Sequence, residues 1–343
     1  MRVCVVGCGS LGGIIAAKLS RSPAHEVWAI DKNPEILRVA RMQGFAVRWR
    51  AKTEYYRVRL LEKPEELPCP ADCIILATKT VDLPESAAAM RPCLADAGCY
   101  VTIQNGLAGL QLAESIGKEL VVPASVLWGA SMTGPGMYTI TAKGGFLVGA
   151  IGDPRSPKAT RVCETLADAF PASQVANIEG VQWAKLLITA TLTSFGAITG
   201  LGFGAMLGRR AIRELFLEVG AEGLKVARTR GIELEPLGKL LRVDLLMQQH
   251  GMPLWTKHLL MRFMGMKHAH TESSMLASLR QGTRTEVDDI NGVIVKLGAE
   301  MGVDTPLNSR IVEVVRNLEA GTLKPGLENL ARFRRAPEDA PDA

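Results

Sequence analysis

The sequence lacks the paired cysteines of a disulfide framework and the clustered ligands of a structural zinc site. Its seven cysteines, at positions 4, 8, 69, 73, 93, 99 and 163, are odd in number, have no regular pair spacing and have no histidine cluster beside them. Cysteines without a disulfide or metal partner are typical of proteins in the reducing cytoplasm. We therefore expect a cytoplasmic protein without a metal ion in its functional site.

A large excess of charge and an export signal are also missing. Forty basic and 35 acidic residues give a net charge of +5, which suits an anionic ligand but not a nucleic-acid partner. Residues 1 and 2 are followed at once by an apolar run and a glycine loop, which leaves no room for a signal segment. We expect neither a nucleic-acid partner nor export.

One run without charge, from 186 to 208, is long enough to span a bilayer, which takes about 20 apolar residues. However, it contains four threonines, a serine and five glycines, and is therefore less apolar than a spanning helix. We expect a buried helix followed by a glycine-rich turn, and no membrane association.

What the sequence does contain is a glycine motif in an informative context. The β-branched run at 2–6 predicts a buried strand, and positions 13–19 predict a helix. Between them lies GCGSLG, which consists of Gly7, Cys8, Gly9, Ser10, Leu11 and Gly12. Glycines in this order permit a tight turn and the close approach of a pyrophosphate to the helix N-terminus. The motif predicts a dinucleotide-binding Rossmann domain.

The residue after the second predicted strand, at 26–30, is Asp31. An acidic side chain there accepts hydrogen bonds from the adenosine ribose and repels a 2′-phosphate, which favours NAD(H). Basic residues follow at positions 32, 48, 50, 52, 57 and 59. One of them could receive a phosphate, so NADP(H) is not excluded, although a solvated face explains most of them more simply.

Further strands are predicted at 73–77 and 99–103, and polar residues follow each of them. In a doubly wound, mostly parallel sheet the carboxyl ends of the strands face the ligand crevice. Lys79 and Asn105 are therefore candidates for cofactor or substrate contacts; the alternatives are a surface lysine and a turn asparagine. We also expect a hairpin-like stretch at 137–152 and a helix at 157–170.

Strand patterns end near residue 175, and helical periodicity dominates after about 178. We expect a Rossmann domain at 1–175, a helical substrate domain at 176–335 and a disordered tail at 336–343. Early in the helical half, Lys185, Thr189 and Thr193 recur every four residues and so share one helix face. A lysine there can act as general acid on a carbonyl oxygen, whereas the alternative is a helix-end lysine that extends into solvent.

A second polar cluster lies further along the chain. Ser273 and Ser274 precede a helical stretch, where their hydroxyls either cap the helix or bind a substrate carboxylate. Glu286 follows at the start of the next helical segment, where acidic residues also favour the first turn. The spacing alone leaves these alternatives open.

Taken together, these motifs resemble the ketopantoate reductases (2-dehydropantoate 2-reductases). The resemblance rests on GCGSLG, Lys79, the QNG at 104–106, the GPG at 134–136, the WAKL at 183–186, the SSML at 273–276 and the RTEVDDING at 284–292. It implies a Rossmann domain joined to an all-helical domain, with the active site in the cleft between them. It also implies that Lys185 is the general acid, that Glu286 assists it, that Asn105 and Ser274 contact substrate, and that Lys79 lies near the cofactor.

The chain departs from the family pattern at two substrate positions. Family members usually carry asparagines where this chain has Thr189 and Thr193. Threonine is shorter and lacks the paired donor and acceptor of an amide, so we expect a roomier pocket than ketopantoate needs. A ketone or secondary alcohol larger than ketopantoate is therefore an alternative substrate. The family commonly uses NADPH, against which Asp31 argues.

Two further expectations concern other classes of function and assembly. A protein that senses the dinucleotide without catalysis is the alternative from another class, although it would have little need for Lys185 and Glu286. The apolar content of the helical half suggests a homodimer. The stretch at 247–270 is rich in Met and Trp and would form either an apolar wall of the cleft or ordinary core.

Overall fold

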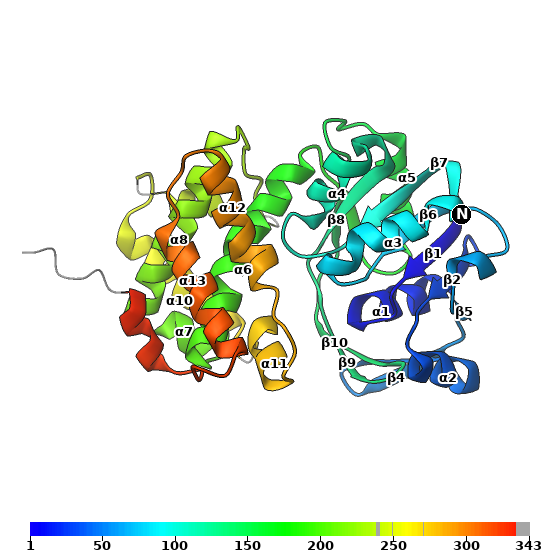
Figure 1. The fold of residues 1–343 in the computed structure, drawn as a ribbon, viewed down its shortest axis with the longest axis horizontal. Coiled ribbons are helices and arrows are strands. Elements are labelled where there is room, and N and C mark those ends of the chain that lie inside the picture. The colour runs from blue at the N-terminus through cyan, green and yellow to red at the C-terminus, as the bar shows by residue number, and fades with distance from the viewer. Residues whose placement is uncertain (238–240, 249, 270, 334–343) are drawn as a thin grey trace, which may run out of the picture. The chain divides into compact units, whose positions relative to one another are not determined.

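The computed structural model describes residues 1–237, 241–248, 250–269 and 271–333 (Figure 1). They form two compact units, which we call the N-terminal unit (Met1–Glu179) and the C-terminal unit (from Gly180 onward). The division follows residue 179, compared with the expected 175. The tail predicted at 336–343 lies outside the described residues.

Strands and helices alternate through most of the N-terminal unit. The strands are β1 (Arg2–Val6), β2 (Glu26–Ile30), β3 (Phe45–Trp49), β4 (Lys52–Tyr56), β5 (Arg59–Leu61), β6 (Ala71–Leu76), β7 (Leu94–Thr102), β8 (Val121–Val126), β9 (Gly129–Gly134), β10 (Met137–Ala142), β11 (Phe146–Val148) and β12 (Ala172–Gln174). The α-helices are α1 (Ser10–Leu19), α2 (Pro34–Gln43), α3 (Leu83–Ala89), α4 (Ala108–Ile116) and α5 (Pro157–Ala167).

The main sheet has eight strands in the order β12-β11-β8-β7-β6-β1-β2-β5, and all of its pairs are parallel except β11 with β8. Alternate residues of β1 point to opposite faces of the sheet. Val3 and Val5 pack with α1 and α5, whereas Cys4 and Val6 pack with α3 and α4. Helices therefore cover both faces, which confirms the predicted doubly wound Rossmann fold.

A smaller sheet, β4-β3-β10-β9, packs against α1. It shows that the hairpin predicted at 137–152 is wrong, because β10 pairs with β3 and β9 whereas β11 joins the main sheet. The reason lies in the two glycines between them. A Cβ on Gly144 would come 1.9 Å from the Leu127 carbonyl oxygen, and one on Gly145 would come 2.0 Å from that of Pro171. Only glycine fits this close to those carbonyl groups, and the chain crosses from the small sheet to the main sheet at these two residues.

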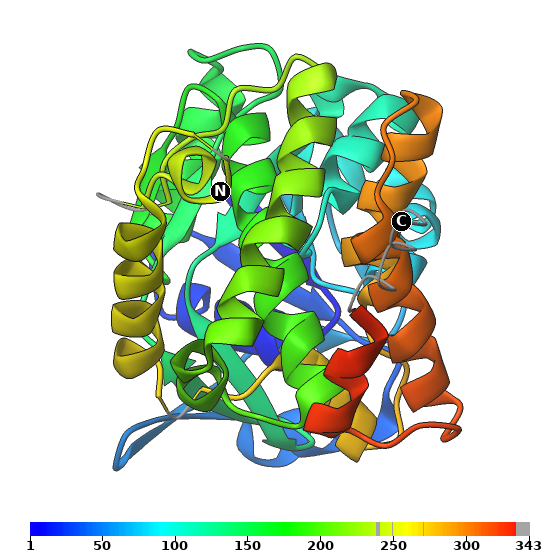
Figure 2. The ribbon, with the colours of Figure 1, turned by 90° about the vertical axis from the view of Figure 1, so that its left-hand side faces the viewer.

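The C-terminal unit is helical and has no strand longer than an isolated bridge among its described residues (Figure 2). Its α-helices are α6 (Ile178–Thr199, which begins in the N-terminal unit), α7 (Phe203–Gly208), α8 (Arg210–Thr229), α9 (Val243–Met247), α10 (Leu254–Lys267), α11 (Ser274–Arg280), α12 (Val293–Glu300) and α13 (Pro306–Glu319). A π-helical turn, η5 (Asp288–Gly292), leads directly into α12.

The charge-free run that raised the question of a membrane span folds as most of α6 followed by α7. Trp183, Leu186, Leu187 and Ala190 form the buried apolar face expected for α6. The glycine-rich turn is shorter than predicted, because the chain turns at Gly200, where φ is +71°, and becomes helical again at Phe203. Among the described residues, no helix is long and apolar enough to cross a bilayer.

Candidate active site

The glycine loop between β1 and α1 has the geometry that a pyrophosphate needs. Gly7 has φ +91°, which favours glycine, and a Cβ on Gly12 would lie 2.0 Å from the Gly7 carbonyl oxygen. Gly9, the N-cap of α1, has open space where a Cβ would stand, and no side chain caps the helix. The first N–H groups of α1 can therefore donate to an anion. These residues fit a dinucleotide.

Asp31 stands at the end of β2, and two backbone N–H groups hold its carboxylate. The N–H of Cys8 donates to Oδ2 at 2.6 Å, and the N–H of Asn33 donates to Oδ1 at 2.8 Å. The Cys8 thiol itself is buried, and burial raises its pKa well above the ordinary range, so this side chain is a neutral packing group. Asp31 thus lies beside the glycine loop in a fixed orientation.

Lys79 and Asn105 follow the ends of two adjacent parallel strands, β6 and β7. Lys79 is exposed and Asn105 is half-buried. The side chain of Gln104 joins the two strand ends, because its Nε2 donates to the Leu76 carbonyl at 2.8 Å and to the Thr78 carbonyl at 3.0 Å. Sequence reasoning missed this role of Gln104, although its place directly after a predicted strand was a signal.

In the C-terminal unit, Lys185 lies about two turns into α6, so it is not a helix-end lysine. Its side chain is half-buried, and burial lowers the pKa of its ammonium group to about 8, while the Glu286 carboxylate acts in the opposite direction. A lysine with this pKa can both give and accept a proton near neutral pH.

Thr189 and Thr193 lie on the same face of α6 as Lys185, as predicted. Both hydroxyls donate within the helix, from Thr189 Oγ1 to the Lys185 carbonyl at 2.8 Å and from Thr193 Oγ1 to the Thr189 carbonyl at 2.7 Å. These bonds use the only proton that each hydroxyl can donate. A substrate beside this face would meet methyl groups and acceptor lone pairs.

The segment that carries Glu286 is anchored on both sides. The N–H of Thr285 donates to Glu319 Oε1 at 2.6 Å. Asp288 accepts ion-paired hydrogen bonds from Arg284 at 2.8 Å and from Arg316 at 2.7 Å. Glu286 is half-buried two residues before the start of the π-helical turn η5, and such turns are frequent at functional sites.

The two serines differ in their surroundings. Ser273 is buried and caps α11, since its Oγ accepts from the Leu276 N–H at 3.0 Å and donates to the Thr193 carbonyl at 2.7 Å. This bond ties the start of α11 to the helix that carries Lys185. Ser274 is exposed in the first turn of α11, and its contact with substrate stays a prediction.

A buried polar network behind this site was not predicted. Asn291 accepts from Ser194 Oγ at 2.6 Å and donates to the Ala190 carbonyl and to Asn308 Oδ1, both at 3.0 Å. Asn308 in turn donates to Glu222 Oε2 at 2.8 Å. The signal in the sequence was an asparagine at 291 on the apolar side of a helix. The network connects α6, which carries Lys185, to η5, which follows Glu286.

The described residues thus form two chemical sets. The N-terminal unit offers uncapped N–H groups, a fixed carboxylate and strand ends with polar residues, which together can hold a dinucleotide. The C-terminal unit brings together Lys185 and Glu286, which can transfer a proton. Among the described residues, no group of three or more histidine, cysteine or acidic side chains could hold a metal ion.

Two family models match the chain. The model described as "Ketopantoate reductase PanE/ApbA" matches residues 3–153, and the model described as "Ketopantoate reductase PanE/ApbA C terminal" matches residues 177–319. Among curated proteins, the 2-dehydropantoate 2-reductase of Archaeoglobus fulgidus is 27% identical over 93% of this chain and 98% of its own length. That of Aquifex aeolicus is 24% identical over 94% and 99%.

Solved structures show the same fold. A PanE/ApbA family ketopantoate reductase from Ralstonia eutropha has a TM-score of 0.79 at 24% identity, over 94% of this chain and 99% of that one. D-mandelate dehydrogenase with NADH and anilino(oxo)acetate has a TM-score of 0.81 at 20% identity, with the same coverage.

Proposed function

Because the chain belongs to the ketopantoate reductase family, a family of NAD(P)-dependent oxidoreductases acting on CH–OH and C=O groups, we propose that it interconverts a 2-oxo acid and the corresponding 2-hydroxy acid. The observation that carries this proposal is Lys185, a half-buried lysine with a pKa of about 8 beside Glu286. The bound dinucleotide would exchange hydride with the substrate carbon.

In the direction of reduction, the Lys185 ammonium gives its proton to the carbonyl oxygen of the substrate as that oxygen gains negative charge. In the direction of oxidation, the neutral amine takes the proton from the hydroxyl. Glu286 favours the charged form of Lys185 and so keeps the acid available. Ser274 and Asn105 are the residues that we expect to hold the substrate.

We infer that the substrate is larger and less polar than ketopantoate. The support is the face formed by Thr189 and Thr193, whose hydroxyl protons are used within α6. A substrate oxygen that needs a hydrogen-bond donor would find none there, and unpaired polar groups on a substrate lower its affinity. That a D-mandelate dehydrogenase shares the fold is compatible with an aromatic 2-oxo acid.

Reduction of ketopantoate itself, as a step of pantothenate synthesis, is the second candidate. It is favoured by the curated relatives, which are named 2-dehydropantoate 2-reductase and match over more than nine-tenths of this chain. The residues at Lys79, Asn105, Lys185, Ser274 and Glu286 agree with it as well, because they match the family pattern.

We further infer that NAD(H) is the preferred cofactor. Asp31 supports this preference, because its carboxylate is held at the end of β2, where it can accept from ribose hydroxyls and repels a 2′-phosphate. The basic residues at 48, 57 and 59 are exposed, and the Arg59 guanidinium lies over the Trp28 ring at 5.8 Å.

The test compares ketopantoate and phenylglyoxylate, a flat aromatic 2-oxo acid, with NADH and with NADPH. We expect kcat/KM of at least about 10⁴ M⁻¹s⁻¹ for phenylglyoxylate with NADH, and at least about tenfold less for ketopantoate. Thr189→Asn should move the ratio toward ketopantoate, since an amide restores a donor. The opposite preference would establish reduction of ketopantoate as the function. If neither 2-oxo acid is turned over although the dinucleotide binds, the result would favour a protein that senses the dinucleotide without catalysis.

Self-association is supported by α10. Trp255, Leu259, Phe263 and Met266 recur on one side of this helix, and Trp255 and Phe263 are 70% and 61% exposed. We propose that this face pairs with the same face of a second copy, because a twofold interface uses one self-complementary patch. The protein should sediment as a dimer and Phe263→Glu as a monomer, with Met42→Glu as the exposed control. A monomeric wild-type protein would contradict this pairing. Binding of that monomer to lipid vesicles would show that the face contacts a membrane surface instead.

We also place the protein in a reducing compartment such as the cytoplasm. The support is that all seven cysteines are free and four of them are buried.

A further inference from the structure

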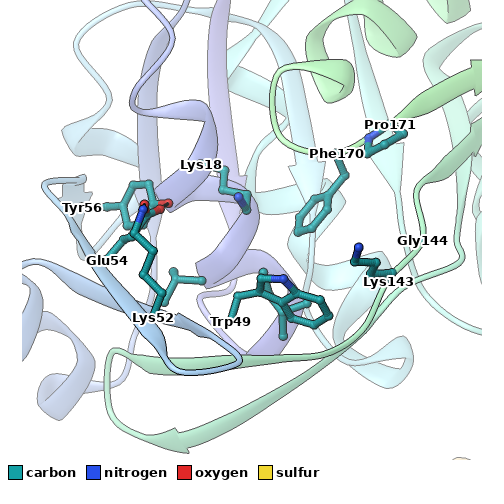
Figure 3. A pocket seen from close by; sticks show the side chains of 11 residues that line it. Lys18, Trp49, Lys52, Glu54, Tyr56, Lys143, Gly144, Phe170 and Pro171 are labelled. Carbon is teal, nitrogen blue, oxygen red and sulfur yellow. Dashed lines mark hydrogen bonds and ion pairs between the residues drawn. The ribbon is translucent and has the colours of Figure 1, made fainter.

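A cavity of about 520 Å³ lies within the N-terminal unit, where the small sheet meets the end of α1 (Figure 3). Its walls include Trp49 of β3, Tyr56 of β4 and Phe170, which follows α5. Lys18, Lys52 and Lys143 also line it, together with one carboxylate, that of Glu54. Cavities of about 300–1,000 Å³ with apolar walls and a few charged groups are typical of small-molecule sites.

This cavity is not the dinucleotide site. None of the residues assigned to the cofactor lines it: not the glycine loop, Asp31, Lys79 or Asn105. Lys18, which lines the cavity, lies in the last turn of α1, whereas the glycine loop precedes the first turn. With a rise of 1.5 Å per residue, Lys18 lies about 12 Å along the helix from Ser10, its first residue.

The aromatic walls have fixed positions. Phe170 stacks on Trp128 with 4.1 Å between ring centroids, and Trp128 also meets Phe146 edge to face at 5.9 Å. Trp49 is half-buried in β3, with its indole ring in the cavity wall (Figure 3). Phe170 and Trp49 therefore present apolar surface to the cavity, which suits a flat aromatic body.

The charges of the cavity are unevenly matched. Glu54 pairs with Lys52 at 2.6 Å and with Arg21 at 3.3 Å, and it accepts from the Tyr56 hydroxyl at 2.7 Å. The hydrogen bonds from Lys52 and Tyr56 lower the pKa of Glu54 to about 2, so this carboxylate is ionised and already neutralised. Within the described part of the chain, Lys18 and Lys143 form no ion pair, and the Lys18 ammonium lies 5.2 Å from the Phe170 ring centroid.

We propose that this cavity is a second ligand site, which binds a small aromatic carboxylate. The flat body of the ligand packs between Trp49 and Phe170, and its carboxylate accepts hydrogen bonds from Lys18 and Lys143. Two unpaired ammonium groups beside apolar rings favour a carboxylate on a hydrophobic ring over an inorganic anion, which would leave the rings without a partner. The site functions independently of the reaction proposed for Lys185.

The test uses 2-naphthoate and titration calorimetry on the full chain without dinucleotide. We expect one molecule of 2-naphthoate to bind, and the double variant Lys18→Gln/Lys143→Gln to bind at least about tenfold more weakly, because charge-assisted hydrogen bonds are lost. The control is Lys63→Gln/Lys118→Gln, which removes two exposed lysines of the same unit and should leave the affinity unchanged. The uncharged 2-naphthamide should bind at least tenfold more weakly than 2-naphthoate.

Two outcomes would overturn the proposal: no binding of 2-naphthoate at millimolar concentration, or binding that the Lys18/Lys143 variant does not weaken. Lys185→Ala separates this site from the proposed active site, because it should lower turnover by at least about 100-fold but leave 2-naphthoate binding intact. Saturating NADH should also leave it intact. If Lys185→Ala or NADH removes the binding, the ligand occupies the active site and the second site does not exist.

Discussion

The two units of this protein bring their candidate functional residues into position in different ways. In the N-terminal unit, the proposed cofactor residues lie within a few positions of a strand end, and Gly7 and Asp31 directly follow β1 and β2. In the C-terminal unit, Lys185 and Glu286 come from segments a hundred residues apart and depend on packing between helices. The positions of the first set therefore follow from the local sequence, whereas those of the second set depend on the tertiary structure.

The difference also appears in what supports each set. Backbone groups hold the proposed cofactor residue Asp31, whose carboxylate accepts from the N–H of Cys8. Side chains hold the segments that carry the proposed catalytic residues, through Ser273, the ion pairs of Asp288 and the network around Asn291. A single side-chain change should therefore disturb the C-terminal unit more than the N-terminal unit, and the following changes test this comparison.

The largest effect is expected for Lys185→Ala. The loss of the general acid should lower turnover by roughly 10² to 10⁴ with little change in the dissociation constant of NADH. Steady-state kinetics and a cofactor titration measure the two quantities. Lys296→Ala, an exposed lysine of α12, is the control and should have neither effect. Turnover within threefold of wild type would remove Lys185 from the mechanism.

Asn291→Ala should destabilise the C-terminal unit. The substitution removes the hydrogen bonds that the Asn291 side chain makes with Ser194 Oγ, Asn308 Oδ1 and the Ala190 carbonyl, and a buried polar group that loses its bond costs about 1–3 kcal/mol. We expect the free energy of unfolding to fall by about 3 kcal/mol in urea denaturation, against less than about 0.5 kcal/mol for Gln281→Ala at an exposed position. Equal free energies of unfolding for the two variants would show that the network does not stabilise the fold.

Asp31→Ala should weaken the binding of NADH more than the binding of NADPH. The loss of a carboxylate that accepts from the ribose should weaken NADH binding by about 10- to 100-fold, while NADPH loses less because its 2′-phosphate is no longer repelled. Fluorescence titration with both dinucleotides measures this difference. If the two affinities fall equally, the carboxylate does not contact the ribose.

The pH dependence should be the mildest effect. Because the pKa of Lys185 is lowered to about 8, its acid form is present below that pH and is lost above it. Reduction should slow about tenfold between pH 7 and pH 9, while oxidation should accelerate through the same interval. Glu286→Gln removes the carboxylate that raises this pKa, so its profile should shift to lower pH. Profiles that are flat from pH 7 to 9 would contradict the assignment.

The cofactor half of the molecule could be predicted from the sequence to a large extent. The strand at 26–30, the helix after GCGSLG and the place of Asp31 follow from patterns that span a few residues. The sequence failed at 137–152, where β10 and β11 join different sheets, because the backbone contacts of Gly144 and Gly145 are with residues distant in the chain.

In the C-terminal unit, the sequence by itself determined the helix face of Lys185, Thr189 and Thr193, because helical periodicity is local. Only the tertiary structure decided that the lysine is half-buried near Glu286, that the threonine hydroxyls are used within the helix, and that Asn291 belongs to the core. The physical reason is that a pKa and a buried hydrogen bond depend on which groups from distant segments displace water around them.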